Sequence, residues 1–249
     1  MKIDLMDQVA LVTGSAHRVG RAIAVELARQ GVHIMVHYHS SDDGTVRDAL
    51  TDIKSYGVSA FAQQADLEDP ESLSGLFEAV ESNYGRLDIL VNSASVFHAN
   101  NLMDMSLADW QQSLNVNLTA PMLCTQQAVR MMDGNDGRGG SIINILDYGS
   151  VQPWVDRVDH GVSKAALLML TKISALSLGA RNIRVNGVLP GPVMKSPGLP
   201  EERWQQVGAR TPLGRSGEAE DVARAVAYLA SEDFITGAVL AVSAGEHLI

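Results

Sequence analysis

The chain has little cysteine and a deficit of positive charge. Its 249 residues include a single cysteine, Cys124, so no disulfide can form within the chain and no group of cysteines can hold a metal. One unpaired cysteine fits a reducing compartment, and we expect a cytoplasmic protein. The 29 Asp and Glu outnumber the 19 Lys and Arg, and the formal net charge of −10 argues against a nucleic-acid-binding surface.

Targeting signals and long apolar runs are also missing from the sequence. The N-terminus has no basic segment followed by an apolar one, and no apolar run approaches a membrane span, so we expect no membrane association. No spacing of His, Asp and Glu suggests a metal site, and we expect none. Surface or loop positions are expected for His17, His33, His98 and His247.

The stretch Val9–Arg21 carries the first positive signal. The apolar run Val9–Val12 predicts a buried strand, Thr13-Gly14 breaks it, and a helical pattern opens at Gly20. Strand, glycine turn and helix form the start of a dinucleotide-binding βαβ unit, because the turn admits a pyrophosphate and the helix N-terminus offers it free N–H groups. A lone glycine turn is weak evidence, so the rest of the chain must support it.

Strand-like and helix-like segments alternate along the whole chain. This alternation predicts an α/β fold of Rossmann type: one domain over residues 1–249, with a doubly wound, parallel, seven-stranded sheet and helices on both faces. The expected strands are Val9–Val12, Ile34–His37, Ser59–Gln63, Ile89–Asn92, Ser141–Leu146, Arg184–Leu189 and Ala238–Val242. Beyond the helix from Gly20, the expected helices are Asp48–Tyr56, Pro70–Tyr84, Leu107–Met132, Val162–Leu178 and Asp221–Ala230.

The end of the second strand indicates which dinucleotide would bind. An NAD site usually has a carboxylate there, but His37–Ser41 contains none before Asp42. Hydroxyls, an imidazole and the guanidinium of Arg18 would instead bind a 2′-phosphate, so we predict NADPH as cofactor. The alternative is that Arg18 is a solvated loop residue. Asp66 suits the adenine amino group; the alternative is a helix cap, for which Asp69, beside Pro70, is the better candidate.

Several motifs in order give the chain a resemblance to the short-chain dehydrogenase/reductase family over essentially its full length. They are TGSAHRVG at Thr13–Gly20, QADL at Gln64–Leu67, NSAS at Asn92–Ser95, NVNLTAP at Asn115–Pro121, SKAAL at Ser163–Leu167, VNGVLPGPV at Val185–Val193, PLGRSGEAEDVA at Pro212–Ala223 and TGAVLAVSAG at Thr236–Gly245. Together with the fold, the resemblance implies a cofactor site formed by Gly14, His17, Arg18, Val19, Gly20, His39, Ser40, Ser41, Asp66, Leu67, Asn92, Ser93, Ala94, Lys164, Pro190, Gly191 and Val193.

Within that family the chain looks most like the pteridine reductases. They share an arginine in the glycine turn, as at Arg18, a second strand ending like His37–Ser41, and a phenylalanine like Phe97 after the Asn-Ala-Ser motif. The resemblance implies that Phe97 stacks on a pterin ring and that Ser95 hydrogen-bonds to it, and a flat heteroaromatic ring does gain from such stacking. The alternative for Phe97 is a hydrophobic loop anchor.

The catalytic residues depart from the family pattern of serine, tyrosine and lysine. Lys164 matches the lysine, but His160 stands four residues earlier in place of tyrosine, and Asp147 holds the serine position, as in pteridine reductases. An aspartate beside an imidazole favours the imidazolium, so we predict that Asp147 and His160 form the proton donor. Lys164 would anchor the nicotinamide ribose, and the resemblance implies that Asn117 holds a relay water. The alternative is that His160 marks an altered or lost activity.

Two further features follow from the resemblance. Residues 193–212, after Pro190-Gly191-Pro192, would form a substrate lid, and the long helices Leu107–Met132 and Val162–Leu178 would pair between the subunits of a homotetramer. Val242–Gly245 departs from the common Val-Asp-Gly-Gly, so that corner is expected to pack differently.

The function predicted from the sequence is therefore NADPH-dependent reduction of a small pterin or dihydrofolate-like substrate. Two alternatives stay open: a carbonyl or 3-oxoacyl-thioester reductase, and a non-catalytic NADP(H)-binding regulatory protein. The fold alone cannot decide among them.

Overall fold

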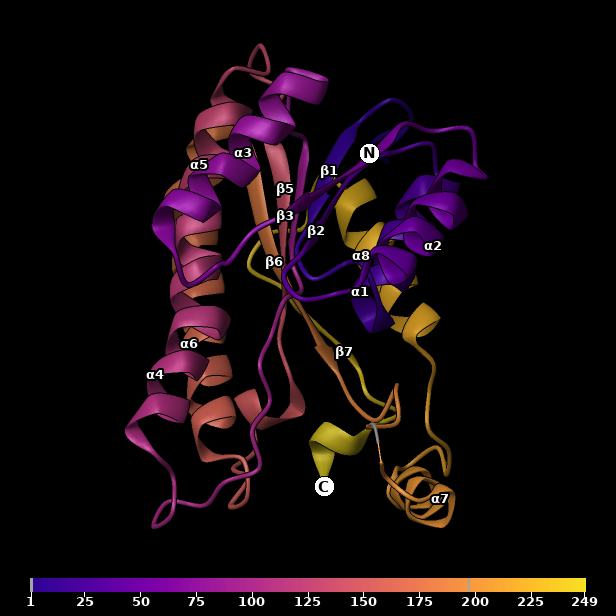
Figure 1. The fold of residues 1–249 in the computed structure, drawn as a ribbon, viewed down its shortest axis with the longest axis vertical. Coiled ribbons are helices and arrows are strands. Elements are labelled where there is room, and N and C mark those ends of the chain that lie inside the picture. Colours follow the sequence, from indigo (N-terminus) through magenta and orange to yellow (C-terminus); the bar gives the residue numbers. More distant parts are fainter. Residues whose placement is uncertain (1, 197) are drawn as a thin grey trace.

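The computed structural model describes residues 2–196 and 198–249 and contains one parallel sheet of seven strands. The strand order is β3-β2-β1-β4-β5-β6-β7, so the chain reverses its winding direction between β1 and β4 (Figure 1). This architecture confirms the predicted Rossmann-type fold. The strands are β1 Val9–Val12, β2 His33–Tyr38, β3 Ala60–Gln64, β4 Ile89–Asn92, β5 Gly140–Ile145, β6 Ile183–Pro190 and β7 Val239–Val242.

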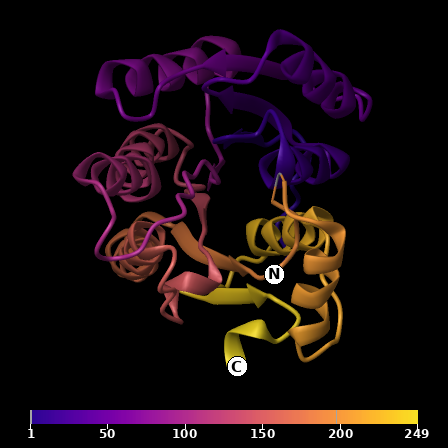
Figure 2. The ribbon, with the colours of Figure 1, turned by 60° about the horizontal axis from the view of Figure 1, so that its bottom comes forward.

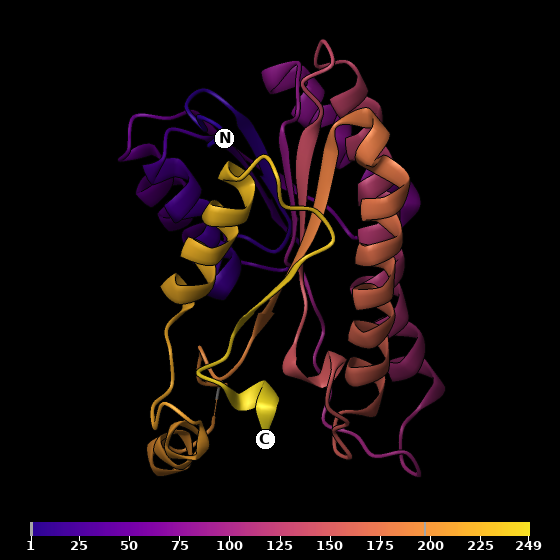
Figure 3. The same ribbon diagram turned by 180° about the vertical axis from the view of Figure 1, so that it is seen from behind.

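Helices cover both faces of the sheet, as Figures 1 and 3 show from opposite sides. One layer contains α1 Arg18–Arg29, α2 Asp43–Lys54 and α8 Ala219–Ser231. The other contains α3 Pro70–Tyr84, α4 Leu107–Leu114, α5 Ala120–Asp133 and α6 Val158–Leu178. Four short helical turns, η1 Asn115–Thr119, η2 Tyr148–Ser150, η3 Gly179–Arg181 and η4 Glu246–Leu248, and the helix α7 Glu201–Arg210 complete the elements.

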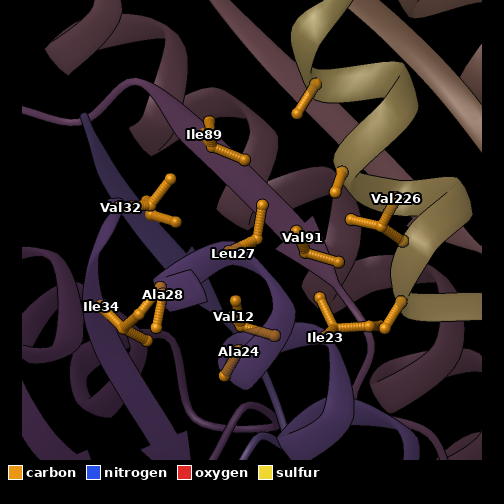
Figure 4. Packing of buried hydrophobic residues seen from close by; sticks show 14 of the residues in the cluster. Val12, Ile23, Ala24, Leu27, Ala28, Val32, Ile34, Ile89, Val91 and Val226 are labelled. Carbon is orange, nitrogen blue, oxygen red and sulfur yellow. The ribbon is translucent and has the colours of Figure 1, made fainter. Parts of the chain in front are cut away.

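The core lies between the sheet and its helices, and β4 is the middle strand, with β1 beside it. All four residues of β1 and of β4 are buried, which explains why β1 and the first three residues of β4 are continuous apolar runs rather than alternating ones. Figure 4 shows Val12 and Val91 of the sheet against Ile23 and Leu27 of α1, with Val226 of α8 completing the contact. The glycine turn is therefore fixed at both ends by packed elements.

The helix boundaries differ from the sequence expectations where a capping or tertiary contact sets them. α2 begins at Asp43, earlier than expected, because the Asp42 side chain accepts the Thr45 N–H at 3.0 Å. The expected helix Leu107–Met132 is interrupted by the π-helical turn η1, and α6 begins four residues earlier than expected, at Val158.

α6 requires one correction to the sequence expectations. The segment Val158–Arg181 has a mean hydropathy of 1.3 over its most apolar window and is long and apolar enough to cross a membrane. Length and composition alone give this result, and core helices of globular proteins pass the same test. Here α6 packs along β6 and places three ionisable side chains, Asp159, His160 and Lys164, in the interior.

The carboxyl ends of the strands face the end of the molecule where α7 and the C-terminal segment lie, which Figure 2 turns forward. In sheets of this kind, ligands bind beyond these strand ends, at the point where the winding reverses. The fold therefore directs attention to the segments that follow β1, β2, β4, β5 and β6.

Candidate active site

A cleft of about 520 Å³ opens at the carboxyl ends of the strands. It brings together residues that lie far apart in the sequence, and among the predicted site residues only Asn92 and Asn117 do not line it. The predicted residues that do are Gly14, His17, Arg18, Val19, Gly20, His39, Ser40, Ser41, Asp66, Leu67, Ser93, Ala94, Ser95, Phe97, Asp147, His160, Lys164, Pro190, Gly191 and Val193.

The glycine turn forms one wall of the cleft and has the shape of an anion cradle. Gly14 has a φ of 65°, and a Cβ on Gly20 would lie 2.2 Å from the Gly14 carbonyl oxygen, so both positions require glycine. His17 precedes α1 but provides no side-chain cap, and no acidic residue occupies the first turn of the helix. The first N–H groups of α1 are thus left to an anionic group.

His37 holds this turn in place, a role that the sequence analysis missed. Its ring is 1% exposed; Nδ1 accepts the Gly14 N–H at 3.0 Å, and Nε2 donates to the Ala65 carbonyl at 3.1 Å. Burial lowers the pKa of His37 to about 4. The ring is therefore neutral at pH 7 and links the ends of β1 and β3. The sequence feature that could have indicated this role is a histidine directly after the apolar run Ile34–Val36.

Arg18 lies at the rim of the same wall in an unfavourable backbone conformation. Its φ is 55°, in the left-handed region that glycine adopts more readily, and its side chain is exposed. His39, Ser40 and Ser41 lie across the rim, and the His17 ring approaches the Ser41 hydroxyl at 3.4 Å. Burial, and then the Arg18 charge, lower the pKa of His17. This rim offers a cation, hydroxyls and imidazoles.

Asp66 is not the cap of α3. Asp69 caps that helix by accepting the N–H groups of Glu71 and Ser72, each at 3.2 Å, which confirms the sequence assignment of the cap. Asp66 instead accepts the Glu68 N–H at 2.9 Å and lines the cleft.

His160 lies at the other end of the cleft and has one nitrogen without a partner. Its Nδ1 lies 3.0 Å from the Val96 carbonyl oxygen, and because a carbonyl only accepts, Nδ1 carries a proton. Nε2 is buried, makes no hydrogen bond, and lies 3.7 Å from Oδ2 of Asp147. Because Nδ1 carries a proton, Nε2 of the neutral ring has only a lone pair. Only the imidazolium, which has a proton on both nitrogens, can donate a proton from Nε2.

Lys164 lies one helical turn beyond His160 on α6. Its Nζ donates to the Ile145 carbonyl at 2.8 Å, and the residue is 2% exposed. Burial lowers the pKa of Lys164 to about 8, although the attraction of Asp147 opposes that shift. The ammonium group is therefore still largely charged at pH 7, at the base of the cleft.

Asn117 lies in the π-helical turn η1, behind the cleft. Its Oδ1 accepts from the Ser95 hydroxyl at 3.0 Å and from the Val96 N–H at 2.9 Å. Its Nδ2 donates to the Val96 carbonyl at 3.1 Å and to the Ser163 hydroxyl at 3.0 Å. The amide thus fixes the segment that carries the partner of His160, and its hydrogen-bonding capacity is used within the protein. That Asn117 holds a relay water stays a prediction.

Aromatic rings surround His160. The Phe97 ring meets the His160 ring edge to face at 4.6 Å, and Trp154, which the sequence analysis did not single out, stacks on His160 at 6.4 Å with an interplanar angle of 17°. The Arg157 guanidinium lies 5.0 Å above the Phe97 ring. Phe97 remains 47% exposed and lines the cleft, so part of its ring is free to meet a ligand.

Two neighbouring features complete the site. The Tyr148 hydroxyl donates to the Ile249 carbonyl at 3.3 Å, and the residue does not line the cleft. Ala244, in the segment Val242–Gly245 that was expected to pack differently, adopts a φ of 50°. Among residues 2–196 and 198–249, no group of three or more His, Cys, Asp or Glu could hold a metal ion.

The sheet, the glycine turn and the cleft define a Rossmann-type nucleotide-binding fold, and comparisons with known proteins identify the family. A family model described as Enoyl-(Acyl carrier protein) reductase matches residues 14–247. The chain belongs to the short-chain dehydrogenase/reductase family.

Individual relatives match nearly the whole chain. The 3-oxoacyl-[acyl-carrier-protein] reductase FabG of Aquifex aeolicus is 37% identical over 98% of this chain and 99% of its own. A short-chain dehydrogenase/reductase from Serratia marcescens superposes with a TM-score of 0.90 at 34% identity, covering 97% of this chain and 98% of that one. A blue fluorescent protein from a metagenomic library, in complex with NADPH, gives a TM-score of 0.89 at 35% identity with the same coverage.

Proposed function

We propose that the protein is an NADPH-dependent reductase in which the His160 imidazolium donates the proton. One observation carries the proposal: Nε2 of His160 is buried in the cleft wall, makes no hydrogen bond, and faces the Asp147 carboxylate at 3.7 Å. Burying an unpartnered polar atom is costly, so such an atom at a cleft is a candidate for contact with a ligand.

The cleft suits a phosphorylated dinucleotide. Gly14 and Gly20 leave room that a Cβ would fill, and α1 presents uncapped N–H groups to a pyrophosphate. Arg18 and the hydroxyls of Ser40 and Ser41 would bind the 2′-phosphate, and the NADPH complex of a similar protein supports this choice. When bound, this cofactor supplies a hydride to the substrate.

The chain's own residues would manage the proton. The Nδ1–H bond to the Val96 carbonyl holds the His160 ring with Nε2 toward the cleft, and Asp147 stabilises the charged ring until the proton leaves. Lys164 would bind the ribose of the cofactor, and its charge would favour loss of the proton from His160. Asp147 and Lys164 thus act on the imidazolium in opposite senses, which suits a group that must both hold and release a proton.

The relatives favour a ketone as the group reduced. The name 3-oxoacyl-[acyl-carrier-protein] reductase, which a relative at 37% identity carries, supports a 3-oxoacyl thioester as the first substrate class to test. Here His160 would protonate the developing alkoxide.

A specific observation favours the second candidate, a pterin or dihydrofolate-like ring. Asp147 is an acceptor-only carboxylate at a position where a donor would be needed to stabilise an alkoxide, and it suits a substrate N–H instead. The Phe97 ring, half exposed at the cleft, offers a stacking surface for a flat heterocycle. Ser95 lines the cleft beside it, although its hydroxyl already donates to Asn117.

Two features of the surroundings would serve such an enzyme. Residues 193–212, which include α7 and of which residue 197 lies outside the described part of the chain, would cover the bound substrate and exclude water. α6 leaves Val162, Met169, Ile173 and Leu176 exposed, and pairing of such helices would form a homotetramer.

NADPH oxidation with acetoacetyl thioester, biopterin and dihydrofolate tests the proposal. We expect turnover of one class, and a fall of about 10²- to 10⁴-fold in kcat for His160→Phe, since a general acid contributes that much. His160→Tyr should retain more activity than His160→Phe, because a phenol can also donate a proton. Tight NADPH binding without turnover of any of the three would favour the alternative of a non-catalytic binding protein, and unchanged activity in His160→Phe would remove the donor role.

A further inference from the structure

Asp159, the neighbour of His160 on α6, is a fully buried carboxylate that the proposed chemistry does not use. It is 0% exposed and accepts hydrogen bonds from the Ser113 hydroxyl at 2.6 Å, from His98 Nδ1 at 2.8 Å and from the His160 backbone N–H at 2.8 Å. Burial alone would raise the pKa of Asp159, but the hydrogen bonds from Ser113, His98 and the His160 backbone outweigh it and lower the pKa. The carboxylate is therefore ionised.

These partners come from three separate segments. Ser113 lies on α4, His98 lies in the segment that follows β4, and His160 lies in the first turn of α6. Beside this junction, Asn100 Oδ1 accepts the Val158 N–H at 3.1 Å. One carboxylate thus binds the segment after β4 to the beginning of α6.

His98 lies in a loop, as expected, but it also bonds to this buried carboxylate, which the sequence did not indicate. Its side chain is 27% exposed, and since Asp159 can only accept, Nδ1 of His98 must donate. The charge-assisted bond is of the stronger kind. His98 follows Phe97, and Val96, whose carbonyl accepts the Nδ1–H of His160, lies two residues before it.

The Asp159 carboxylate therefore fixes both partners of the Nδ1–H bond of His160, the segment with the accepting Val96 carbonyl and the helix with the donating His160. On the acceptor side, His98 fixes the segment that carries Val96; on the donor side, the His160 backbone N–H bonds to the same carboxylate. We propose that Asp159 and His98 are positioning residues that keep His160 in the Nδ1–H tautomer with Nε2 facing the cleft. The inference rests on the proposed function, in which Nε2 of His160 donates the proton.

An apolar contact could join these segments without the cost of burying a carboxylate, because replacing buried ion pairs by packed apolar groups is often neutral or stabilising. The carboxylate differs from an apolar contact because its hydrogen bonds are directional. It requires a donor on His98, on Ser113 and at the His160 backbone, and so it fixes how the two segments face each other.

Two readouts test the inference, ¹⁵N NMR of histidine-labelled protein and steady-state kinetics. The variants are His98→Ala, which removes the donor, Asp159→Asn, which turns an accepting oxygen into a donor, and His98→Gln, whose amide can still donate. His33→Ala is the control, because His33 lies at the start of β2, away from the cleft, and its Nδ1 accepts the Ser59 N–H at 3.0 Å.

In the parent protein with a neutral His160 ring, we expect one tautomer with the proton on Nδ1. In His98→Ala and Asp159→Asn we expect a mixture of tautomers and a kcat at least about tenfold lower, the scale of loss when a reacting group is misplaced. The Kd for NADPH should not change, and His98→Gln should recover most of both effects. His33→Ala should leave the tautomer and kcat unchanged.

A single Nδ1–H tautomer in folded His98→Ala, with kcat equal to that of the control, would overturn the inference. His98 is partly exposed, so His98→Ala provides the test even where Asp159→Asn fails to fold. The tautomer is read without substrate, so the two proposals fail separately. A tautomer change in a protein with no reductase activity keeps the positioning role and removes the proposed function.

Discussion

The buried Nε2 of His160 lies 3.7 Å from Oδ2 of Asp147, and the opposite nitrogen of the same ring is bonded to the Val96 carbonyl. The bond at Nδ1 fixes the direction of the ring and turns Nε2 toward the cleft, where the carboxylate faces it. These contacts are the ones that the proposed donor role of His160 requires.

Asp147→Asn should lower activity. The amide keeps the size of the side chain but puts a neutral group where a carboxylate faces Nε2 of His160 at 3.7 Å. We expect kcat/KM to fall by about five- to tenfold, which corresponds to an attraction of about 1 kcal/mol between two charges at this separation near solvent, because Asp147 is partly exposed. Asp156→Asn, an exposed change of the same charge, is the control. An unchanged kcat/KM would contradict the pairing.

Arg18 should lower the stability of the protein and raise its preference for NADPH over NADH. Arg18→Gly relieves the positive φ of 55° and should raise the free energy of unfolding by about 1 kcal/mol. It should also lower the preference for NADPH over NADH by about tenfold or more, the value of a charge-assisted hydrogen bond to a phosphate. Arg18→Ala should lose the preference without the gain in stability. Urea unfolding and the two Kd values measure both effects, and a preference that survives in Arg18→Ala would refute the role of Arg18.

His37 should make stability depend on pH. Its pKa of about 4 in the folded protein is below the ordinary value of 6.5, so the unfolded chain binds the proton more readily. The contribution is complete above pH 6.5 and is lost as the pH falls toward 4. Between pH 7 and pH 5 this one group should cost roughly 2 kcal/mol of unfolding free energy. His37→Gln can make both hydrogen bonds without titrating and should show a smaller loss in urea unfolding at the two pH values; equal losses would contradict this account.

Ala244→Gly should stabilise the protein. Ala244 adopts a φ of 50°, where an L side chain is strained, and glycine removes that strain. We expect a gain of about 1 kcal/mol, which corresponds to a rise in Tm of roughly 2–4 °C for a chain of this size. Ala241→Gly, in the neighbouring strand β7, is the matched control and should lower Tm, because glycine costs entropy in an extended strand. A lower Tm in Ala244→Gly would show that the side chain contributes more than the strain costs.

Lys164 should limit activity at alkaline pH. Burial lowers its pKa to about 8 from the ordinary 10.5, so the charge is lost from about pH 8 upward. Because that charge would hold the ribose of the cofactor, KM for NADPH should rise above this pH. Lys164→Arg, whose side chain keeps its charge, should show a flatter dependence of KM on pH. The same pH dependence in both proteins would assign the change to another group.

The alternation of strands and helices was predictable because it depends on local patterns. β1 and β4 are buried on both faces, which makes β1 and the first three residues of β4 continuous apolar runs in the sequence, and the boundaries of both strands were predicted correctly. The starts of α2 and α6 were misplaced, since α2 begins at the Asp42 cap and α6 begins where Val158 bonds to Asn100, a residue far from it in the chain.

Most of the cleft was likewise predictable, because strand ends collect at one edge of a parallel sheet. The supporting contacts were not. Trp154 stacks on His160, and His98 bonds to Asp159, across distances in sequence that no local pattern encodes.

By itself, the sequence determined the order of the elements, the glycine turn and the residue types present at the strand ends, because these depend on periodicity and on backbone sterics. Only the tertiary structure decided what those side chains do. The same residue type, histidine, is a neutral link between two strand ends at His37, a partner of a buried carboxylate at His98, and at His160 a ring whose Nε2 is buried without a hydrogen bond. The difference is in their partners and burial, which arise only when distant segments pack together.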